Sequence, residues 1–352
     1  IALCRFFAIY DLPFVIVCAS RSDAITRTAW SDRVVISRID RGLDVKLFDA
    51  VLQAVRGVYG SFARSVYCPT TEFINHFVLK ERAALLQLGW KVTLPAAEVY
   101  HALTGKASSP AIVKQLIGLS APSQLHWSDV SAPCVLKPRI NLGQGKVYYP
   151  RLCQTDDELR QALDEIDPEH WFAQSWVDGQ SYYLCAFLTT DGKHAHFWQQ
   201  NLLQQPGGKS IVLARTVPNP GIEVAPLFRG LLERGYHGPL MMEVIRDDGD
   251  RFHYIEINPR FWGPLQLALD ACPDILRLFA HDAGVRLNTA AISVGDACHP
   301  TYWYAWQLGA QMAGCRRYPA LKDVESAHTL QVLLDRWDVY ARSDTRLLHG
   351  RH

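Results

Sequence analysis

The sequence predicts an α/β domain at the start of the chain, followed by a region of hairpins and helices. Its 352 residues are typical of two or three domains and are enough for a sizeable core. Strand and helix signals alternate at the beginning of the chain, which is typical of a parallel sheet with crossover helices. Further along, Asp191-Gly192 and Asp248-Gly249 separate apolar runs and predict hairpins.

The first domain is expected at residues 1–100. A helix at Ile1–Tyr10 precedes the first strand, and because an α/β domain normally begins with a strand, we expect a few native residues before Ile1. Apolar periodicity predicts strands at Phe14–Cys18, Arg33–Ser37 and Lys91–Leu94, and helices at Lys46–Val58 and Glu72–Gln87. The Gly-x-Gly-x-x-Gly fingerprint of dinucleotide-binding domains is absent from the sequence, which disfavours a dehydrogenase.

The second domain is expected at residues 101–290 and the remainder, 291–352, as a C-terminal helical tail. Thr155–Ile166 is a predicted helix with a capping box, and Leu330–Arg336 is a helix of the tail. The other expected helices are Ser109–Gly118, Val224–Gly235, Leu265–Ala271 and Pro273–Ala283. The expected strands are Pro133–Pro138, Phe172–Val177 and the hairpin of Ser181–Thr190 with His194–Gln200.

Composition excludes several classes of protein. Apolar residues make up 49% of the chain and charged residues 20%, as in a globular protein. Basic and acidic residues balance at 36 and 35 without a basic block, so we expect no nucleic-acid partner. The apolar stretch Phe6–Ala19 is too short for a membrane span and lacks signal-peptide flanks. Nine scattered cysteines without Cys-x-x-Cys spacing indicate reduced thiols in a cytoplasmic protein.

The most informative stretch is 238–263, which predicts a hairpin carrying Glu243 on one strand and Glu256 with Asn258 on the other. Strand alternation points Tyr254, Glu256 and Asn258 to one side. Two carboxylates and an amide oxygen form a hard-oxygen site suited to Mg²⁺. Arg260 would hold an anion beside the metal. Acidic residues on a hairpin are more often a solvated face, but Glu-x-Asn-Pro-Arg with a second Glu on the partner strand favours the metal site.

Lysines and glycines add a candidate phosphate site. Lys137 stands alone in an apolar strand, where a buried ammonium is costly unless it meets an anion; the alternative is a lysine whose head reaches water. Gly143 and Gly145 follow it and would let backbone N–H groups wrap a phosphate. Lys106, in Thr-Gly-Lys before a helix, is either a second phosphate ligand or a surface lysine.

These pieces, in this order, resemble the ATP-grasp superfamily from about Phe14 to Asp274. The most specific part is Tyr254–Arg260, preceded by Met242-Glu243-Val244. The chain is most similar to ATP-grasp carboxylate–amine ligases that carry a Rossmann-like pre-ATP-grasp domain. The resemblance implies two α+β subdomains, at about 107–172 and 173–290, with the nucleotide between them.

The resemblance also assigns roles and cofactors, namely ATP with Mg²⁺ or with Mn²⁺ in its place. An acidic residue usually follows the hinge glycine to hold the ribose, but Gln180 follows Gly179 here, so the ribose contact falls to Gln180 or Asp178. The other implied roles are phosphate binding for Lys106 and Lys137, a covering loop for Gly143 and Gly145, an adenine hinge for Gln174, Ser175, Trp176 and Val177, metal binding for Glu243, Glu256 and Asn258, and catalysis for Arg260 with Lys137.

The implied reaction phosphorylates a small-molecule carboxylate to an acyl phosphate, which an amine converts to an amide. The stretch His196–Pro218 would line the acceptor side, with hydrogen bonds from Gln199, Gln200, Asn201 and Gln204, and with Lys209 and Arg215 holding a second anion; alternatively it is a solvated polar loop. Thiol, sugar-amine and ammonia acceptors, a non-catalytic nucleotide-binding module and a homodimer stay compatible with the sequence. A biotin carboxylase is disfavoured because no matching bicarbonate-site pattern lies between the hinge and the hairpin, and a nicotinamide-dependent oxidoreductase has no motif support.

Overall fold

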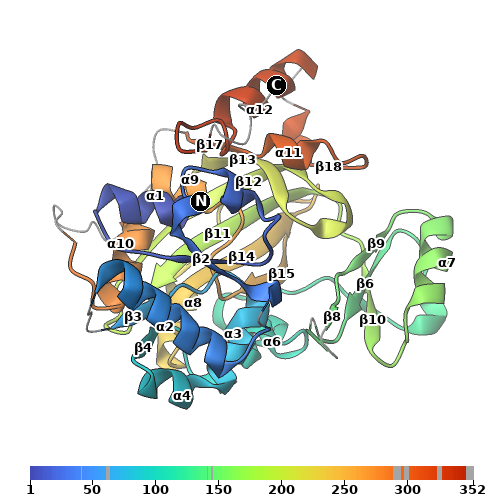
Figure 1. Cartoon of the computed structure of the whole chain (residues 1–352). Coiled ribbons are helices and arrows are strands. Elements are labelled where there is room, and N and C mark those ends of the chain that lie inside the picture. The colour runs from blue at the N-terminus through green and yellow to red at the C-terminus, as the bar shows by residue number, and fades with distance from the viewer. Residues whose placement is uncertain are drawn as a thin grey trace.

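An eight-stranded, largely antiparallel sheet forms the centre of the molecule (Figure 1). The computed structural model describes residues 1–40, 42–60, 64–140, 142–143, 146–287, 295–296, 301–322 and 327–345. The strand order is β15 (Phe252–Asn258), β14 (Gly238–Arg246), β11 (Gln180–Leu188), β12 (His194–Gln204), β13 (Ile211–Val217) and β17 (Trp303–Ala305). Two short strands, β16 (Gly295–Asp296) and β18 (Arg316–Arg317), also pair with β12.

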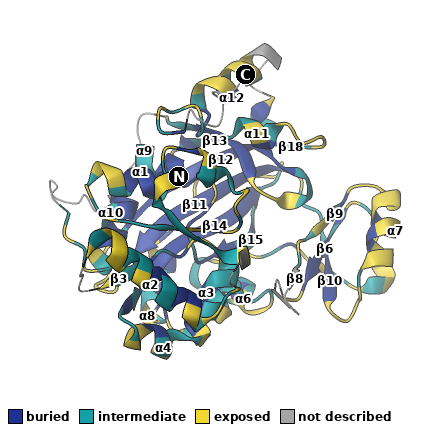
Figure 2. Ribbon diagram, in the orientation of Figure 1, coloured by how far each residue is buried: buried dark blue, intermediate teal, exposed yellow. Residues whose placement is uncertain are grey.

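Helices cover both faces of this large sheet, and its strands β11, β12 and β14 are almost entirely buried (Figure 2). One face packs Phe187 and Phe197 against α1 (Ala2–Ile9), α9 (Leu265–Ala271) and α10 (Asp274–Asp282). The other face packs Trp198 and Leu240 against α5 (Ala97–Thr104), α6 (Ser108–Ile117) and α8 (Ala225–Glu233). Because successive strand residues point to opposite faces, strands covered on both sides are largely apolar on both, which explains the apolar runs of β11 and β14, whereas β12 also buries polar residues.

The N-terminal part contains the predicted parallel strand pairs. Strand β1 (Ile16–Cys18) pairs with β2 (Val34–Ser37), and β3 (Ser65–Tyr67) pairs with β4 (Trp90–Val92), both in parallel. The helices are α2 (Val45–Tyr59), α3 (Glu72–Lys80) and α4 (Arg82–Gln87). The structure differs from the prediction in three ways: β3 and α5 are additional, the helix predicted at Glu72–Gln87 breaks at Glu81, and α1 packs on the large sheet.

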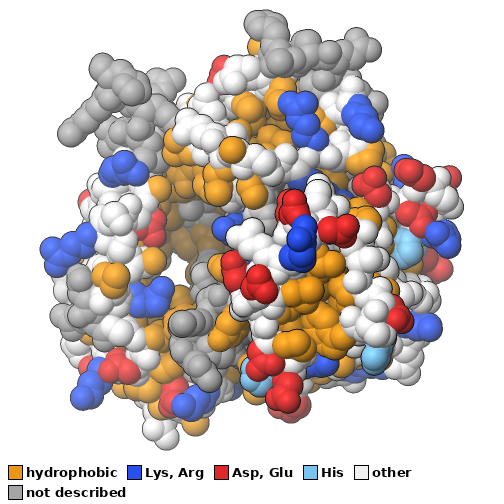
Figure 3. Space-filling view, turned by 90° about the vertical axis from the view of Figure 1, so that its right-hand side faces the viewer, with side chains coloured by type: hydrophobic (Ala, Val, Ile, Leu, Met, Phe, Trp, Pro, Cys, Tyr) orange, Lys and Arg blue, Asp and Glu red, His pale blue; other side chains and the backbone are white. Residues whose placement is uncertain are grey.

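A small four-stranded antiparallel sheet projects from the body of the molecule (Figure 1). Its order is β5 (Gln124–Leu125), β10 (Trp171–Ser175), β6 (Cys134–Pro138) and β9 (Arg151–Cys153), and the hairpin of β7 (Leu142–Gly143) and β8 (Lys146–Val147) follows β6. Helix α7 (Asp156–Glu165) begins with the predicted capping box and packs Leu159 and Ala162 into the core of this unit. Its other side is charged, as the view onto this unit shows (Figure 3).

The C-terminal segment completes the large sheet, so the prediction of a helical tail is wrong for part of its length. The aromatic run Tyr302–Trp306 supplies β17, which pairs with β13, and β18 pairs with β12. These strands are too short to show a periodicity, whereas α12 (Ala327–Trp337) was predicted and α11 (Gln307–Ala310) is a single short turn. Short 3₁₀ helices lie at Ala24–Arg27, Ser31–Arg33, Arg38–Asp40, Trp127–Asp129, Pro206–Gly208 and Pro319–Leu321.

Eight cysteines lie in the part of the chain that the structure describes, and all are free thiols. No helix among the described residues is long and apolar enough to cross a membrane.

Candidate active site

The predicted hairpin is formed by β14 and β15, and it places Glu243 directly opposite Glu256. Its turn is organised by Asp247, whose Oδ1 accepts hydrogen bonds from the backbone N–H groups of Gly249 and Arg251. The Asn258 amide donates to Glu256 Oε1 over 2.6 Å, so the amide and both carboxylates gather on one face of the sheet. The structure therefore brings together all three residues predicted to bind a metal.

Tyr254 was predicted on the same side as Glu256, and this is wrong. A bulge between Glu243 and Val244 shifts the register, so that Tyr254 pairs with Val244 and packs into the core on the opposite face. Its hydroxyl group is hydrogen-bonded to Ser109 Oγ of α6. A bulge of this kind re-aims side chains next to functional sites, and here it keeps Glu256 and Asn258 on the side of Glu243.

Electrostatics support a cation between the carboxylates. Burial, followed by the neighbouring charge of Glu256, raises the pKa of Glu243 to about 7, although Ser181 Oγ donates to Glu243 Oε1 over 2.8 Å. Glu243 is only 8% exposed, so a divalent ion would relieve both the burial and the repulsion. No group of three or more His, Cys, Asp or Glu side chains suitable for a metal occurs among the described residues. Two carboxylates and an amide still fit Mg²⁺, which keeps waters and bridges to phosphates.

Two lysines lie beside these carboxylates. Lys106, in the turn between α5 and α6, places its Nζ 3.6 Å from Glu256 Oε2. Lys137, on β6, is 8% exposed, and burial together with the charge of Lys106 lowers its pKa to about 8. Burial alone would raise the pKa of Glu256, but Lys106 and Lys137 outweigh it and hold that pKa below its usual value. The cluster is well suited to a polyphosphate with its metal.

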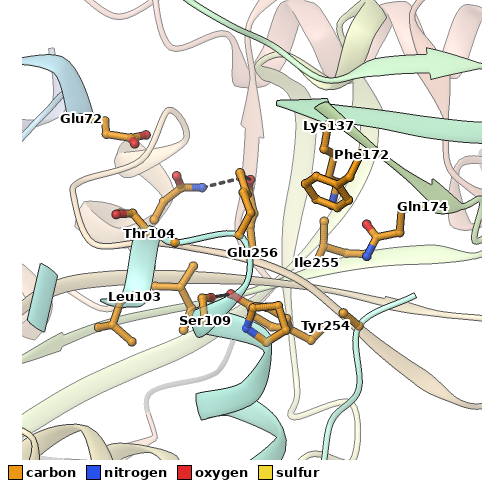
Figure 4. A pocket seen from close by; sticks show the side chains of 16 residues that line it. Glu72, Leu103, Thr104, Ser109, Lys137, Phe172, Gln174, Tyr254, Ile255 and Glu256 are labelled. Atoms are coloured by element: carbon orange, nitrogen blue, oxygen red, sulfur yellow. Dashed lines mark hydrogen bonds and ion pairs between the residues drawn. The ribbon is translucent and has the colours of Figure 1, made fainter. Parts of the chain in front are cut away.

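A pocket opens between the small sheet and β15 (Figure 4). Lys137, Phe172 and Gln174 project from the small sheet toward Glu256, while Glu72 lines the pocket from the N-terminal part. A second pocket adjoins the first, because Ala121 lines both. The predicted hinge residues Ser175, Trp176 and Val177 line this second pocket, together with Asp178. The two pockets together could hold an elongated ligand.

The hinge itself is fixed at both ends. Gln174 donates through Nε2 to the Pro122 carbonyl over 2.9 Å, and Ser175 N–H donates to the Ser123 carbonyl over 2.8 Å. At the other end, Gly179 has φ 152°, and a Cβ there would lie 2.1 Å from the Arg246 carbonyl oxygen. Only glycine allows this close passage from the small sheet to the large one.

Gln180 does not present a free amide to a ribose. It is buried, and its Nε2 donates to the carbonyl groups of Ser181 and Asn201, over 3.0 and 2.6 Å. Its Oε1 accepts a hydrogen bond from the backbone N–H of Ala320 over 2.8 Å. Asp178, by contrast, is exposed at the second pocket and is the better ribose ligand of the two alternatives.

The stretch His196–Pro218 forms most of β12 and all of β13, so the alternative interpretation as a solvated polar loop is wrong. Register pairs Thr216, Gln199 and Tyr183 with Glu243 in one row, and Arg215 belongs to the next row, on the opposite face. Arg215 donates to Gln200 Oε1 over 2.8 Å and stacks on Trp303, so the structure separates it from the metal ligands.

The amides of β12 are used internally. Gln199 donates to Asn201, Asn201 donates to Ser181, and Gln204 donates to the Lys209 carbonyl. Lys209 itself is exposed in the turn between β12 and β13, with its Nζ 6.0 Å from the Tyr149 ring centroid of the small-sheet unit. It therefore lies at the rim between the two sheets.

Arg260 follows a tight turn in which its N–H donates to the Asn258 carbonyl over 2.9 Å. Its side chain donates to the Phe261 carbonyl, and its charge contributes to the lowered pKa of Glu256. Arg260 is thus positioned beside the carboxylate cluster. Gly143 lies in β7, and Gly145 lies outside the described residues.

Two residues of this region were not identified from the sequence. Glu72, in the first turn of α3, had no motif around it, and Arg316 belongs to a segment with no periodicity. Glu72 lines the first pocket, and Arg316 packs against the ring of Trp176, which lines the second.

Neither family models nor curated proteins match this chain. Among solved structures, the biotin carboxylase domain of Hydrogenobacter thermophilus 2-oxoglutarate carboxylase, in complex with MgADP, ADP and bicarbonate, matches with a TM-score of 0.59 at 14% identity over 82% of this chain and 69% of that chain. Campylobacter jejuni biotin carboxylase matches with a TM-score of 0.59 at 13% identity over 83% and 70% of the two chains. The ADP complex of N5-carboxyaminoimidazole ribonucleotide synthetase matches with a TM-score of 0.56 at 12% identity over 83% and 78%. These matches confirm the predicted fold class, and identities this low leave the activity to be argued from the site.

Proposed function

Because the chain has the ATP-grasp fold, we propose that it is an ATP-dependent ligase that activates a carboxylate as an acyl phosphate. An amine then takes up the acyl group, and ADP and phosphate are released. In this proposal the units at about 107–172 and 173–290 are the two subdomains that hold the nucleotide.

The observation that carries this proposal is that the two pockets adjoin at Ala121. One pocket is lined by the hinge residues Ser175–Val177, and the other is lined by Lys106, Lys137 and Glu256. A nucleotide with its base at the hinge would extend its phosphates to both lysines. The neighbouring structures solved with ADP support a nucleotide ligand.

The predicted site residues would bind the metal, bind the phosphates and stabilise the acyl phosphate. Glu243, Glu256 and Asn258 would hold Mg²⁺, which neutralises charge on the transferred phosphoryl group when bound. Lys106 and Lys137 bind and orient the phosphates, so that a substrate carboxylate oxygen attacks the γ-phosphorus and the bond to the ADP oxygen breaks. Arg260, beside this cluster, stabilises the acyl phosphate and the oxyanion that forms when the amine attacks. The bond from the acyl carbon to the phosphate oxygen then breaks, and the amine proton passes to solvent.

An amine acceptor is favoured by Glu72. This half-buried carboxylate lines the same pocket as Lys137 and Glu256, and lies 3.5 Å from His76 Nε2. A carboxylate at the wall facing the reaction centre would attract a cationic ammonium group. Thiol acceptors gain nothing from it.

Bicarbonate is a second candidate for the carboxylate. The Hydrogenobacter domain was solved in complex with bicarbonate. The biotin carboxylase domain of a thermophilic 2-oxoglutarate carboxylase bound to bicarbonate also matches, over 99% of this chain and 95% of that chain at 12% identity. The Hydrogenobacter domain is also described as a dimer, which is the support for a homodimer here.

A hydroxylamine-trapping assay tests the proposal. The protein would receive ATP, Mg²⁺, hydroxylamine and pools of carboxylates, with bicarbonate in a separate reaction in which ADP release alone is measured. ADP with a hydroxamate is expected, and it identifies the carboxylate. AMP in place of ADP would mean adenylation and would contradict the proposed mechanism, and nucleotide binding without turnover in any pool would favour a non-catalytic module.

A further inference from the structure

The segment Cys315–Leu321, which we call the strap, crosses the end of the large sheet beside the hinge. Arg316 and Arg317 pair with Gln204 and Leu203 of β12, and Tyr318 N–H donates to the Leu202 carbonyl over 3.0 Å. The side chain of Gln180, the first residue of β11, holds the strap through Ala320 N–H. The strap is therefore anchored to two strands of the sheet that carries the metal ligands.

Arg316 of the strap lies against the hinge. Its guanidinium carbon is 4.6 Å from the ring centroid of Trp176 and 4.7 Å from that of Tyr318, close enough for cation–π attraction to both rings. Its Nη2 is buried and has no hydrogen-bond partner among the described residues. A buried guanidinium N–H that lacks an acceptor is costly, so this position is suited to receive an acceptor from a ligand.

The same guanidinium acts electrostatically on Glu243. Its positive charge is among the influences that lower the pKa of Glu243, which burial raises overall, and Glu243 in turn contributes to the raised pKa of the Tyr318 phenol. Arg316 therefore contacts Trp176, which lines the pocket at the hinge, and lies close enough to Glu243 for their charges to interact.

We propose that Arg316 binds a phosphate oxygen of a nucleoside di- or triphosphate, so that the C-terminal strap forms a wall of the nucleotide site. This inference rests on the proposed function. Arginine suits the role because its planar fork can donate two parallel hydrogen bonds to a phosphate. The strap explains the glutamine after the hinge glycine, because Gln180 is committed to holding the strap.

Binding of adenosine, AMP, MgADP and MgATP should be measured by calorimetry for the wild type, Arg316→Gln, Arg316→Lys and Arg317→Gln. Loss of one charge-assisted hydrogen bond predicts that Arg316→Gln weakens MgADP and MgATP about tenfold or more. Adenosine binding should not change, and Arg316→Lys should fall between the wild type and Arg316→Gln. Arg317 lies on the same strand and is exposed, so Arg317→Gln is the matched control and should bind like the wild type.

Three outcomes would overturn the inference. Arg316→Gln binding MgADP as tightly as the wild type, or more tightly, would show that Arg316 is not a ligand or that it obstructs the cleft. An equal loss for adenosine and MgADP would mean that Arg316 only supports the hinge. A wild type that binds no nucleotide would refute the proposed function itself, which separates the two failures; thermal melting of each variant shows whether it is folded.

Discussion

Lys106 Nζ lies 3.6 Å from Glu256 Oε2, so a predicted phosphate ligand and a predicted metal ligand contact each other directly. Lys106 therefore lies next to a carboxylate oxygen that is predicted to bind the metal. The lysine and a metal ion compete for the charge of the same carboxylate. Nucleotide binding should move the ammonium from Glu256 toward a phosphate.

This contact predicts opposite effects of Lys106→Ala on two ligands. MgATP binding should weaken about tenfold or more, because a charge-assisted contact to phosphate is lost. Mn²⁺ binding without nucleotide should become tighter, because Glu256 loses its competing cation. Calorimetry for ATP and electron paramagnetic resonance for Mn²⁺ check both, with Lys114→Ala, at an exposed position of α6, as control. Weakening of both ligands would argue that Lys106 only supports the fold.

Glu256→Gln should abolish turnover and leave the fold intact. The substitution keeps the shape and the partner Asn258 but removes one of the two charges that face the metal. We expect ADP release to fall by at least about a hundredfold, as on removal of a group that stabilises the transition state. The exposed residue Glu223 provides the control Glu223→Gln. ADP release at the wild-type rate would place the metal elsewhere.

The raised pKa of Glu243 predicts a pH-dependent effect of Mg²⁺ on stability. Its pKa of about 7 in the folded protein exceeds the ordinary value of 4.5, so folding is favoured by the protonated form and stability falls as pH rises between these values. The cost of the ionised form is roughly 3 kcal/mol above this window. Mg²⁺ binds the ionised carboxylate and should recover that cost.

Thermal melting with and without Mg²⁺ tests this at about pH 5.5 and about pH 8. The Mg²⁺-induced rise in Tm should be larger at the higher pH, and Glu243→Gln should remove both the rise and the pH dependence. Glu223→Gln should behave like the wild type. An equal Mg²⁺ effect at both pH values would mean that Glu243 is not a ligand.

The sequence was sufficient to place the three predicted metal ligands together because the determinants of the hairpin are local. Glu243, Glu256 and Asn258 lie on two strands joined by a turn, so alternation and turn chemistry place them together without knowledge of the rest of the fold. The bulge that turns Tyr254 away was not predictable, because it depends on packing against α6, where Ser109 lies.

The residues that sequence reasoning misplaced depend on contacts that form only in the folded chain. Gln180 Oε1 accepts a hydrogen bond from the backbone N–H of Ala320, which is 140 positions away, and no sequence pattern near Gln180 predicts this contact. Gln199 and Asn201 were predicted to donate hydrogen bonds to a substrate, yet Gln199 Nε2 donates to Asn201 Oδ1 and Asn201 Nδ2 donates to Ser181 Oγ inside the sheet. Polar sequence predicts exposure only where a residue has no internal partner.

An ion pair between Arg5 and Asp344 joins the two ends of the described chain. Arg5 of α1 donates to both carboxylate oxygens of Asp344 over 2.7 Å, and to the Val339 carbonyl over 2.9 Å, with side-chain exposures of 8% for Arg5 and 19% for Asp344. Removing one partner leaves a charge buried without compensation, which costs about 3–5 kcal/mol.

Asp344→Asn should therefore lower the free energy of unfolding by several kcal/mol in urea titrations. Arg160→Ala, which breaks an ion pair to Asp157 with exposures of 75% and 85%, should change it by about 0.5 kcal/mol or less. Equal effects of the two variants would show that the contact between the ends contributes no more than a surface pair.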